Sequence, residues 1–522
     1  MTPDETTGEE SHTILDPRRD SSQLPVLVAH TAARSGWQAA AAVIEQHWDS
    51  FAAVAPDQLL AALKALPGQA FVEVPGLLVA ANYLQQASIH DDPTRFFTDG
   101  RLTQATPEND EASLSNLILL TGESAAARTS GRLAIARATA EHARDSLNAL
   151  PSAERAPMAG SLPHLRFQWG RSLDAADAPG TLAEYEEAYE LAHLTQQNVI
   201  ARRAAGHIAW HHAERGRLRQ AELWLARAHA EPATNGRYDV IVFLTSALIR
   251  HDHEDPGAAH DLGRALGLPL GEQWAAALWI SAMIQHTRPG ASSVHAHLEA
   301  ALQSHPEDRS PTGANQRYVT AARARLARLR PGLKIDRSLP DSPSALDHLL
   351  AGVDACQKGR YTTALAHCDA ASAMSAAPRL EAPALLVAAA SHLALGHRET
   401  AADTFRHANA IIDRERLLSA YSFIPTTTVA TLAVLAGEPI HSRNHATAST
   451  QLIPRLSRRE REILALLPSG MPMPRIADEL YISPNTLKAT VRALYRKLGV
   501  SSRQAAVDAT RHLTRDSPPD QH

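Results

Sequence analysis

Cysteine, aromatic residues and long apolar runs are all scarce in this 522-residue sequence, and the scarcity of cysteine and of apolar runs each excludes a class of protein. The only cysteines, Cys356 and Cys368, are too few to crosslink a chain of this length, which excludes a disulfide-stabilised secreted scaffold. Both lie in a helical stretch and are expected to be small buried core residues. The longest apolar runs, such as residues 382–390, are far shorter than the roughly 20 residues that cross a bilayer. The polar, acidic N-terminus has no signal-peptide core, so we expect a soluble cytoplasmic protein without a membrane partner.

The sequence also lacks the motifs of common enzymes. No glycine is followed by lysine, so the phosphate-binding loop of Walker-type ATPases is absent. There is no serine nucleophile elbow, no catalytic Cys/His setting and no recognisable carboxylate pair. The 27 histidines show no metal-ligand spacing on two facing elements. We therefore expect a protein that is not an enzyme and that holds no metal or cofactor.

Two further groups of residues are interpreted as structural. A set of histidines and carboxylates could bind a metal in principle, but the Asp255–Pro256–Gly257 turn within it favours a polar loop between helices. The set consists of His251, His253, Glu254, Asp255, His260 and Asp261. Trp224 and Trp279 are expected to pack between helices rather than to line a pocket.

Alanine is abundant, and with leucine, arginine and glutamate it favours an all-α fold. A chain of this length exceeds what one hydrophobic core supports, so more than one domain is expected. Composition and periodicity predict five segments: a disordered tail (1–25), a helical repeat domain (26–436), a polar linker (437–452), a C-terminal domain (453–513) and a flexible tail (514–522).

Charge is distributed unevenly between these segments. The whole chain carries a formal charge of −5, whereas residues 451–513 contain 11 Lys and Arg against 5 Asp and Glu. Residues 1–450 carry −10. A basic module joined to an acidic body indicates that the C-terminal end alone binds a polyanion.

A glycine–alanine pattern recurs along the helical domain. Each copy has a glycine, then alanine or a larger residue about five positions later, a further packing residue four positions on, and alanine three positions after that. The clearest copies are Gly131, Ala136, Ala140, Ala143; Gly180, Tyr185, Tyr189, Ala192; Gly216, Ala221, Leu225, Ala228; Gly359, Ala364, Cys368, Ala371; and Gly396, Ala401, Phe405, Ala408. Weaker copies begin at Gly36, Gly257 and Gly290.

This pattern predicts stacked helical hairpins. Glycine ends the first helix in a left-handed turn, and alanines let the second helix pack closely against it. A single hairpin cannot bury its own apolar face, so the copies must stack into an α-solenoid. The copies resemble degenerate tetratricopeptide repeats, with spacings of 33 to 49 residues between adjacent glycines. An irregular helical bundle is the alternative.

Local rules predict four helices after Leu456. Ser457 and Glu460 form a capping box for the first, and Pro468 to Gly470 ends it. A short second helix spans about 473–480, and Tyr481–Ile482 forms the turn. Ser483 caps the third helix, which has Pro484 at its first position and ends at Gly499. A fourth helix is expected from Arg503 to about His512.

The third helix, residues 484–498, is predicted to enter the DNA major groove. Leu487, Val491, Leu494 and Leu498 face the core, so the opposite face is free for DNA. The candidate DNA-binding residues on that face and at the helix start are Asn485, Thr486, Lys488, Ala489, Arg492 and Arg496. Lys and Arg donate to guanine, Ala489 permits close approach, and Asn485 and Thr486 suit phosphate oxygens.

The segment resembles the C-terminal domain of LuxR-type (GerE-type) bacterial regulators. The residues that carry the resemblance include Leu456, Ser457, Arg459, Glu460, Glu462, Ile463, Leu464, Leu467, Gly470, Ile476, Ala477, Leu480, Ser483, Pro484, Asn485, Thr486, Lys488, Tyr495, Lys497, Leu498, Gly499 and Arg503. The chain departs from the family at Arg458, at Pro472–Arg475 and at Thr490, where the family usually has proline, a polar run and histidine.

The resemblance implies a sequence-specific transcription regulator that binds double-stranded DNA as a homodimer or higher oligomer and works with RNA polymerase. Activation is favoured over repression by family analogy alone. The repeats are the candidate sensor for an unknown small molecule, peptide or protein. The alternative is a repeat scaffold whose helix-turn-helix has decayed and does not bind DNA unaided, a hypothesis motivated by Pro472, Pro474 and Thr490.

Overall fold

A computed structural model describes residues 15–17, 19–73, 77, 81, 84, 114–234, 236–284, 300, 301, 303, 313–329, 340, 342–440, 458–498, 503 and 506. Within these residues the chain forms α-helices and short 3₁₀ helices and no strand, which confirms the all-α prediction. Among the helices described, none is both long enough and apolar enough to cross a bilayer.

The helices of the N-terminal and central parts of the chain are α1 (Gln23–Ser35), α2 (Trp37–Val54), α3 (Pro56–Lys64), α4 (Gly68–Glu73), α6 (Leu114–Thr129), α7 (Leu133–Ala149), α8 (Ser152–Arg155), η2 (Ala156–Met158), α9 (Leu162–Ala175), α10 (Thr181–Leu194), α11 (Asn198–Glu214), α12 (Leu218–Ala230), η3 (Arg237–Asp239), α13 (Val240–Asp252), α14 (Ala258–Leu266), η4 (Gly271–Gln273), α15 (Trp274–Ile284) and α17 (Ala314–Leu329). They are followed by α18 (Ala345–Gln357), α19 (Tyr361–Met374), α20 (Pro378–Ala394), α21 (Arg398–Glu415), η7 (Leu418–Phe423), α22 (Thr426–Ala436), α23 (Arg458–Leu466), η9 (Leu467–Ser469), α24 (Met473–Glu479) and α25 (Pro484–Leu498).

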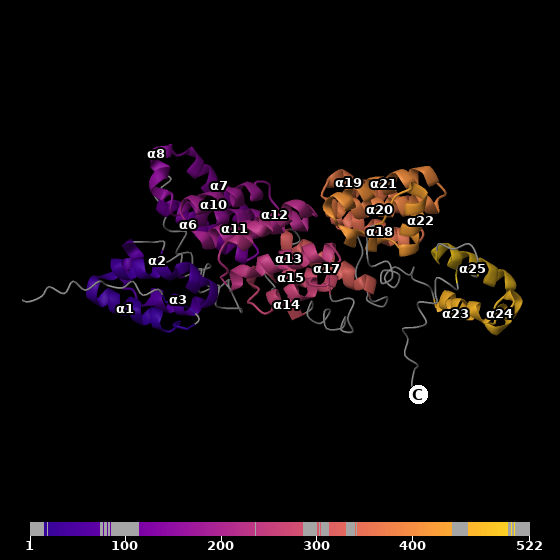
Figure 1. The fold of residues 1–522 in the computed structure, drawn as a ribbon, viewed down its shortest axis with the longest axis horizontal. Helices are drawn as coiled ribbons and strands as arrows, with labels where there is room; N and C mark the ends of the chain where they lie inside the picture. Colours follow the sequence, from indigo (N-terminus) through magenta and orange to yellow (C-terminus); the bar gives the residue numbers. More distant parts are fainter. Residues whose placement is uncertain are drawn as a thin grey trace, which may run out of the picture.

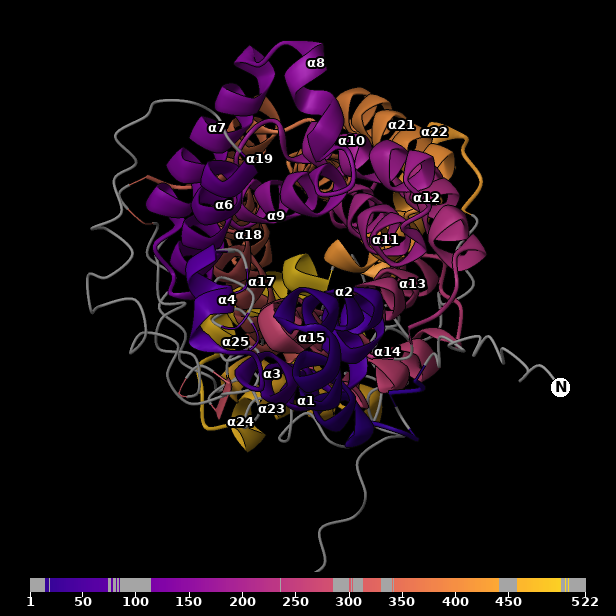
Figure 2. The ribbon, with the colours of Figure 1, turned by 90° about the vertical axis from the view of Figure 1, so that its left-hand side faces the viewer.

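Successive helices pack as antiparallel hairpins that stack on one another (Figure 1). The hairpins are α1/α2, α6/α7, α9/α10, α11/α12, α13/α14, α15/α17, α18/α19 and α20/α21. Seen along the molecule, α9 and α11 lie on the inner side of the stack and α10 and α12 on its outer side (Figure 2). This arrangement confirms the predicted helical repeats.

Left-handed glycines form most of the hairpin turns, as the pattern predicts. Gly131, Gly216, Gly359 and Gly396 have φ between 71° and 87°, and each is followed by an N–H that bonds to the helix carbonyl five residues earlier. Such a bond is the mark of a Schellman cap. Gly36 also has positive φ, at 87°.

The prediction is wrong at Gly257, whose φ is −64°. Glu254 takes the left-handed conformation there, with φ of 55°, because α13 ends at Asp252 and the turn must come directly after it. In the α9/α10 hairpin, α9 ends at Ala175, and both Asp177 and Gly180 in the turn take the left-handed conformation. The copy expected at Gly290 lies outside the described residues, although α15 and α17 do pair across that stretch.

The packing residues of the five clearest copies are buried as predicted, except Tyr189, which is half-buried. In the copy that begins at Gly396, Ala401, Phe405 and Ala408 are fully or almost fully buried between neighbouring helices. Cys368 takes the same role in its own copy and is buried, whereas Cys356 is half-buried. Burial raises the pKa of the Cys368 thiol to about 12, so this cysteine serves as an inert packing group.

The buried apolar residues form separate cores. One runs continuously from Phe167 in α9 to Ala433 in α22. A smaller core joins α1, α2 and α3, and another joins α6, α7 and α9. Leu15 is buried in the α1–α3 core and its N–H donates to His47 Nε2 at 3.2 Å, so part of the tail predicted to be disordered is folded.

A buried ionic cluster joins α13 to the later helices. The Asp252 carboxylate, which is 0% exposed, pairs with the Arg379 guanidinium and accepts a hydrogen bond from Ser419 Oγ. Arg379 also donates to the carbonyl oxygen of Ala213 at the end of α11. We call Asp252, Arg379 and Ser419 the Asp252 cluster; it connects α11 and α13 with α20 and η7.

Candidate DNA-binding site

The last three described helices have a core of their own. Ile463 from α23, Leu467 from η9, Ile476 and Ala477 from α24, and Leu487, Val491 and Leu494 from α25 are buried together. Ala506 is buried against the same core. These helices lie at one end of the molecule, and α1 and α3 lie at the other (Figure 1). In α25, Leu487, Val491 and Leu494 are the core residues that the helical spacing predicts, and the side chain of Leu498 lies outside what the structure describes.

The turn between α24 and α25 sets the direction of α25. Tyr481 adopts a left-handed conformation with φ of 52°, and the Ile482 N–H donates to the Ala477 carbonyl at 2.9 Å. The Ser483 hydroxyl then accepts the Thr486 N–H at 3.1 Å, and Pro484 is the first helical residue. This is the predicted N-cap, and it fixes the helix start at the point where the exposed face begins.

The outer face of α25 is exposed and basic. Asn485, Thr486, Lys488, Ala489 and Arg492 are all exposed. Among the described residues, Lys488 and Arg492 have no ion-pair partner. The structure therefore brings five of the six predicted residues to one face. Arg496 is part of α25, but its side chain lies outside what the structure describes.

Hydroxyl groups on this face already have partners within the helix. The Thr486 hydroxyl lies 2.7 Å from Ser483 Oγ, and the Thr490 hydroxyl donates to the Thr486 carbonyl at 2.8 Å. Thr490, one of the departures from the family pattern, therefore bonds back to its own helix. Asn485 and Lys488 have polar groups free of any partner among the described residues, which leaves them available to a ligand.

The prolines of α24 fit the helix without distortion. Pro472 occupies the N-cap position with ψ of 145°, and Pro474 lies in the first turn. Backbone N–H groups in a first turn have no partner within the helix, so proline costs nothing there. Two donors that could have bound phosphate are nevertheless missing from this helix end.

Two arginines position the helices, a role that the sequence does not reveal. Arg459 pairs with Glu462 at 2.8 Å and donates to the Leu480 carbonyl at the end of α24. Arg503 donates to the Leu467 carbonyl at 2.8 and 3.0 Å and to the Met471 carbonyl. The last carbonyl groups of a helix lack partners within the helix and need donors from elsewhere. An arginine that can reach a predicted helix end is therefore the kind of residue that a sequence search could have picked out. Apart from Arg503 and Ala506, the predicted fourth helix lies outside the described residues, as does Ser457.

The other residues singled out in the sequence do not form a second site of this kind. Asp255 accepts the Gly257 N–H at 2.7 Å, and Arg250 pairs with Asp255 and Asp261, as expected of a polar loop. Trp224 packs edge-on against Tyr189, as predicted. The prediction for Trp279 is only half right, because Trp279 packs on Tyr318 and also lines a cavity.

A short helix, a tight turn and a second helix with an exposed basic face define a helix-turn-helix domain. Residues 454–510 match the family model described as "Bacterial regulatory proteins, luxR family". The C-terminal domain is thus a luxR-family helix-turn-helix domain, as the sequence predicts.

Two curated relatives share this segment. Each is named "Probable transcriptional regulatory protein NarL", from Mycobacterium tuberculosis strains CDC 1551 / Oshkosh and ATCC 25618 / H37Rv. Each is 56% identical to this chain over 54 residues, which is 10% of this chain and 25% of the relative. The chain thus spans about a quarter of the length of the curated relatives that it matches.

Proposed function

We propose that this protein is a DNA-binding transcription regulator that inserts α25 into the major groove. The observation that carries the proposal is the exposed face of α25, where Lys488 and Arg492 have no ion-pair partner among the described residues. Unpaired cations on a groove-sized helix attract phosphates and reach base edges. The match to the luxR family and the NarL name of the relatives support the same function.

Each candidate residue has a distinct expected role. Asn485 and Thr486, at the capped helix start, contact phosphate oxygens and fix the register on DNA. Lys488 and Arg492 donate to guanine O6 and N7, and Arg496 extends the same face. Ala489 lies between them and lets the helix approach the bases closely.

The remaining parts of the proposal rest on analogy with the family. The protein binds two half-sites as a homodimer or higher oligomer, with centres about one helical turn, 34–36 Å, apart. It acts with RNA polymerase, as an activator, in response to a signal that the repeats bind.

DNA binding by the intact protein tests the proposal. Sites are found by genome-wide footprinting, and affinity for one site is then measured over a range of salt concentrations. A Lys488→Ala/Arg492→Ala variant should lose about 1–3 kcal/mol of specific binding for each base contact removed. Each phosphate contact removed should instead lower the salt slope by about 1. The matched control, Arg34→Ala/Lys64→Ala, removes two exposed cations at the opposite end of the molecule and should bind like the wild type.

The alternative is a repeat scaffold with a decayed helix-turn-helix, which the missing donors at Pro472 and Pro474 favour. Salt-sensitive, site-specific binding that the Lys488→Ala/Arg492→Ala variant loses would exclude it. Folded wild-type protein without occupied sites above background would instead favour the scaffold over the regulator.

A further inference from the structure

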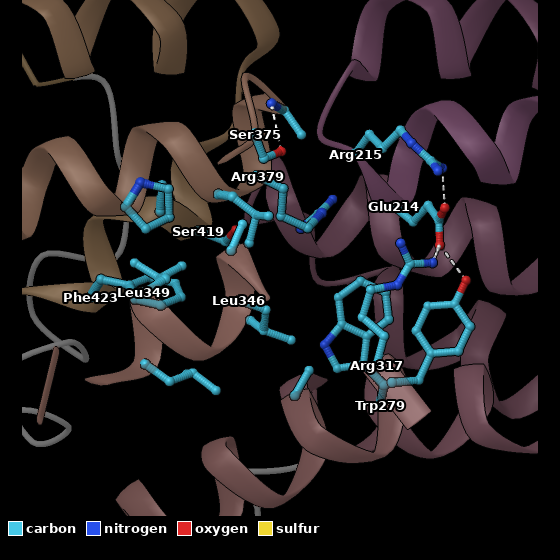
Figure 3. A pocket seen from close by; sticks show the side chains of 18 of the residues that line it. Glu214, Arg215, Trp279, Arg317, Leu346, Leu349, Ser375, Arg379, Ser419 and Phe423 are labelled. Atoms are coloured by element: carbon cyan, nitrogen blue, oxygen red, sulfur yellow. Dashed lines mark hydrogen bonds and ion pairs between the residues drawn. The ribbon is translucent and has the colours of Figure 1, made fainter. Parts of the chain in front are cut away.

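A cavity of about 380 Å³ lies between the two halves of the long repeat core (Figure 3). One wall comes from α11, α15 and α17, and the other from α18, α20 and η7. Cavities of this size with a few converging polar groups are typical of small-molecule sites. The Asp252 cluster connects the same two walls, through Arg379 and Ser419.

The two ends of the cavity differ in chemistry. Figure 3 shows Glu214, Arg215 and Arg317 on one side, Leu349 and Phe423 on the other, and Leu346 between them. The apolar lining comprises chiefly Leu346, Leu349, Leu350, Leu380, Pro383 and Phe423. A ligand that fills this space must therefore have a polar end and an apolar body.

The polar side has an excess of positive charge. Four arginines line the cavity, Arg215, Arg317, Arg325 and Arg379, against the two carboxylates of Asp177 and Glu214. Arg317 pairs with both of these carboxylates, and Arg379 pairs with Asp252 just behind the wall. The lining itself therefore has two more guanidinium groups than carboxylates, while the carboxylates of Asp252 and of Asp174, which lies beside Glu214, are outside the lining. An anionic group fits this excess of guanidinium groups at the cavity surface.

Titration of the lining residues leaves this excess intact at neutral pH. Burial lowers the pKa of His251, the only histidine in the lining, to about 4, so it adds no charge. Burial lowers the pKa of Arg325 to about 10, which still leaves it a cation. Burial alone would raise the pKa of Glu214, but Arg317 and Arg215 outweigh it and lower the pKa, so the Glu214 carboxylate is counted as charged.

Aromatic packing fixes the shape of the cation-rich end. Trp279 stacks on Tyr318 with centroids 5.5 Å apart and planes at 11°, and Trp210 Nε1 donates to the Tyr318 hydroxyl at 2.9 Å. The Tyr318 hydroxyl in turn donates to Glu214. The Arg379 guanidinium lies 5.6 Å from the Trp279 ring centroid. The planar guanidinium groups, held in place beside the indole, match a planar anion such as a carboxylate.

We propose that this cavity binds an amphipathic organic monoanion, with its carboxylate toward Arg317 and Arg379 and its apolar body toward Leu349 and Phe423. Its role as the signal of a transcription regulator rests on the function proposed above. The binding of the monoanion does not rest on that function, because it is inferred from the cavity alone.

Calorimetric titration of the full-length protein tests the site with two probes of equal length and opposite charge. Octanoate should bind, and octylammonium should bind at least about tenfold more weakly, because the arginines repel it. Leu346→Gln and Leu346→Glu differ by one charge at the centre of the cavity. The glutamate variant should bind octanoate at least about tenfold more weakly than the glutamine variant.

Urea midpoints and DNA affinity are measured on the same preparations. Folded protein that does not bind octanoate overturns the inference. Equal affinity for octanoate and octylammonium, or an equal loss of octanoate affinity in the two Leu346 variants, overturns it as well. If DNA binding persists in that case, the proposed function stands without this site. If octanoate binds as expected and DNA does not, the site stands and the proposed function fails.

Discussion

At the scale of single residues, the most consequential contact is the pair of Asp252 and Arg379. The two residues are 127 positions apart, and the aspartate is completely buried. No local pattern marks either of them in the sequence, because their meeting depends on how the hairpins curve. The capped start of α25 is different: Ser483, Pro484 and Thr486 are neighbours, so local rules predict that site well.

Asp252→Ala should destabilise the protein by about 3–5 kcal/mol, because it leaves the Arg379 guanidinium buried without its carboxylate. Asp403→Ala is the matched control, since its partner Arg406 forms an exposed pair that contributes about 0–1 kcal/mol. Urea unfolding followed by circular dichroism measures both. Similar midpoints for the two variants would show that the Asp252 cluster does not hold the two halves together.

His212 should make stability fall in mild acid. Burial, followed by the charges of His211, Arg217 and Arg215, lowers its pKa from an ordinary value near 6.5 to about 4. Between these two values the unfolded chain binds more protons, so stability is lost as pH falls from about 6.5 to about 4. The slope is at most about 1.4 kcal/mol per pH unit.

The test compares urea midpoints of the wild type and His212→Gln from pH 7 to pH 4.5. The variant should show a shallower loss, and His30→Gln, on the exposed surface of α1, controls for the substitution itself. Parallel curves for the wild type and His212→Gln would contradict the assignment.

At the scale of elements, the hairpin turns show where sequence reasoning succeeds and where it stops. Glycine followed by alanines predicts the turns at Gly359 and Gly396 because a left-handed cap is a local event. It fails at Gly257, since Glu254 tolerates the left-handed conformation and no residue preference forbids this. The pattern also cannot tell which turns touch a distant helix.

Gly216→Ala should destabilise the protein more than Gly396→Ala. Both glycines have φ near +80°, so alanine costs about 1–2 kcal/mol at either position. A Cβ on Gly216 would lie 2.6 Å from the backbone nitrogen of Arg379, whereas a Cβ on Gly396 would meet nothing within 4 Å. The clash also disturbs the hydrogen bond from the Arg379 N–H to the Arg215 carbonyl.

Thermal unfolding of the two glycine variants measures this difference. The Gly216 variant should also bind octanoate more weakly, because Arg215 and Arg379 both line the cavity. Equal melting temperatures would mean that α20 moves freely enough to absorb the added methyl group.

At the scale of the whole molecule, the sequence predicts two all-α parts but not how many cores they contain. The repeat core is continuous from Phe167 to Ala433, whereas the core of α23–α25 has fewer than a dozen buried residues in the part of this domain that the structure describes. Local stability follows the amount of buried apolar contact. The two parts should therefore open with different free energies.

Hydrogen exchange of backbone amides should show this difference directly. Amides of α25 should exchange at a lower opening free energy than those of α11 and α20, because their core is smaller. Asp252→Ala should speed exchange in α13 and α20 together and leave α25 unchanged, since only the first two meet at the Asp252 cluster. Exchange that rises equally in α25 would mean that the helix-turn-helix domain and the repeats unfold as one unit. In that case, a ligand bound in the proposed cavity would stabilise α25 together with the repeats.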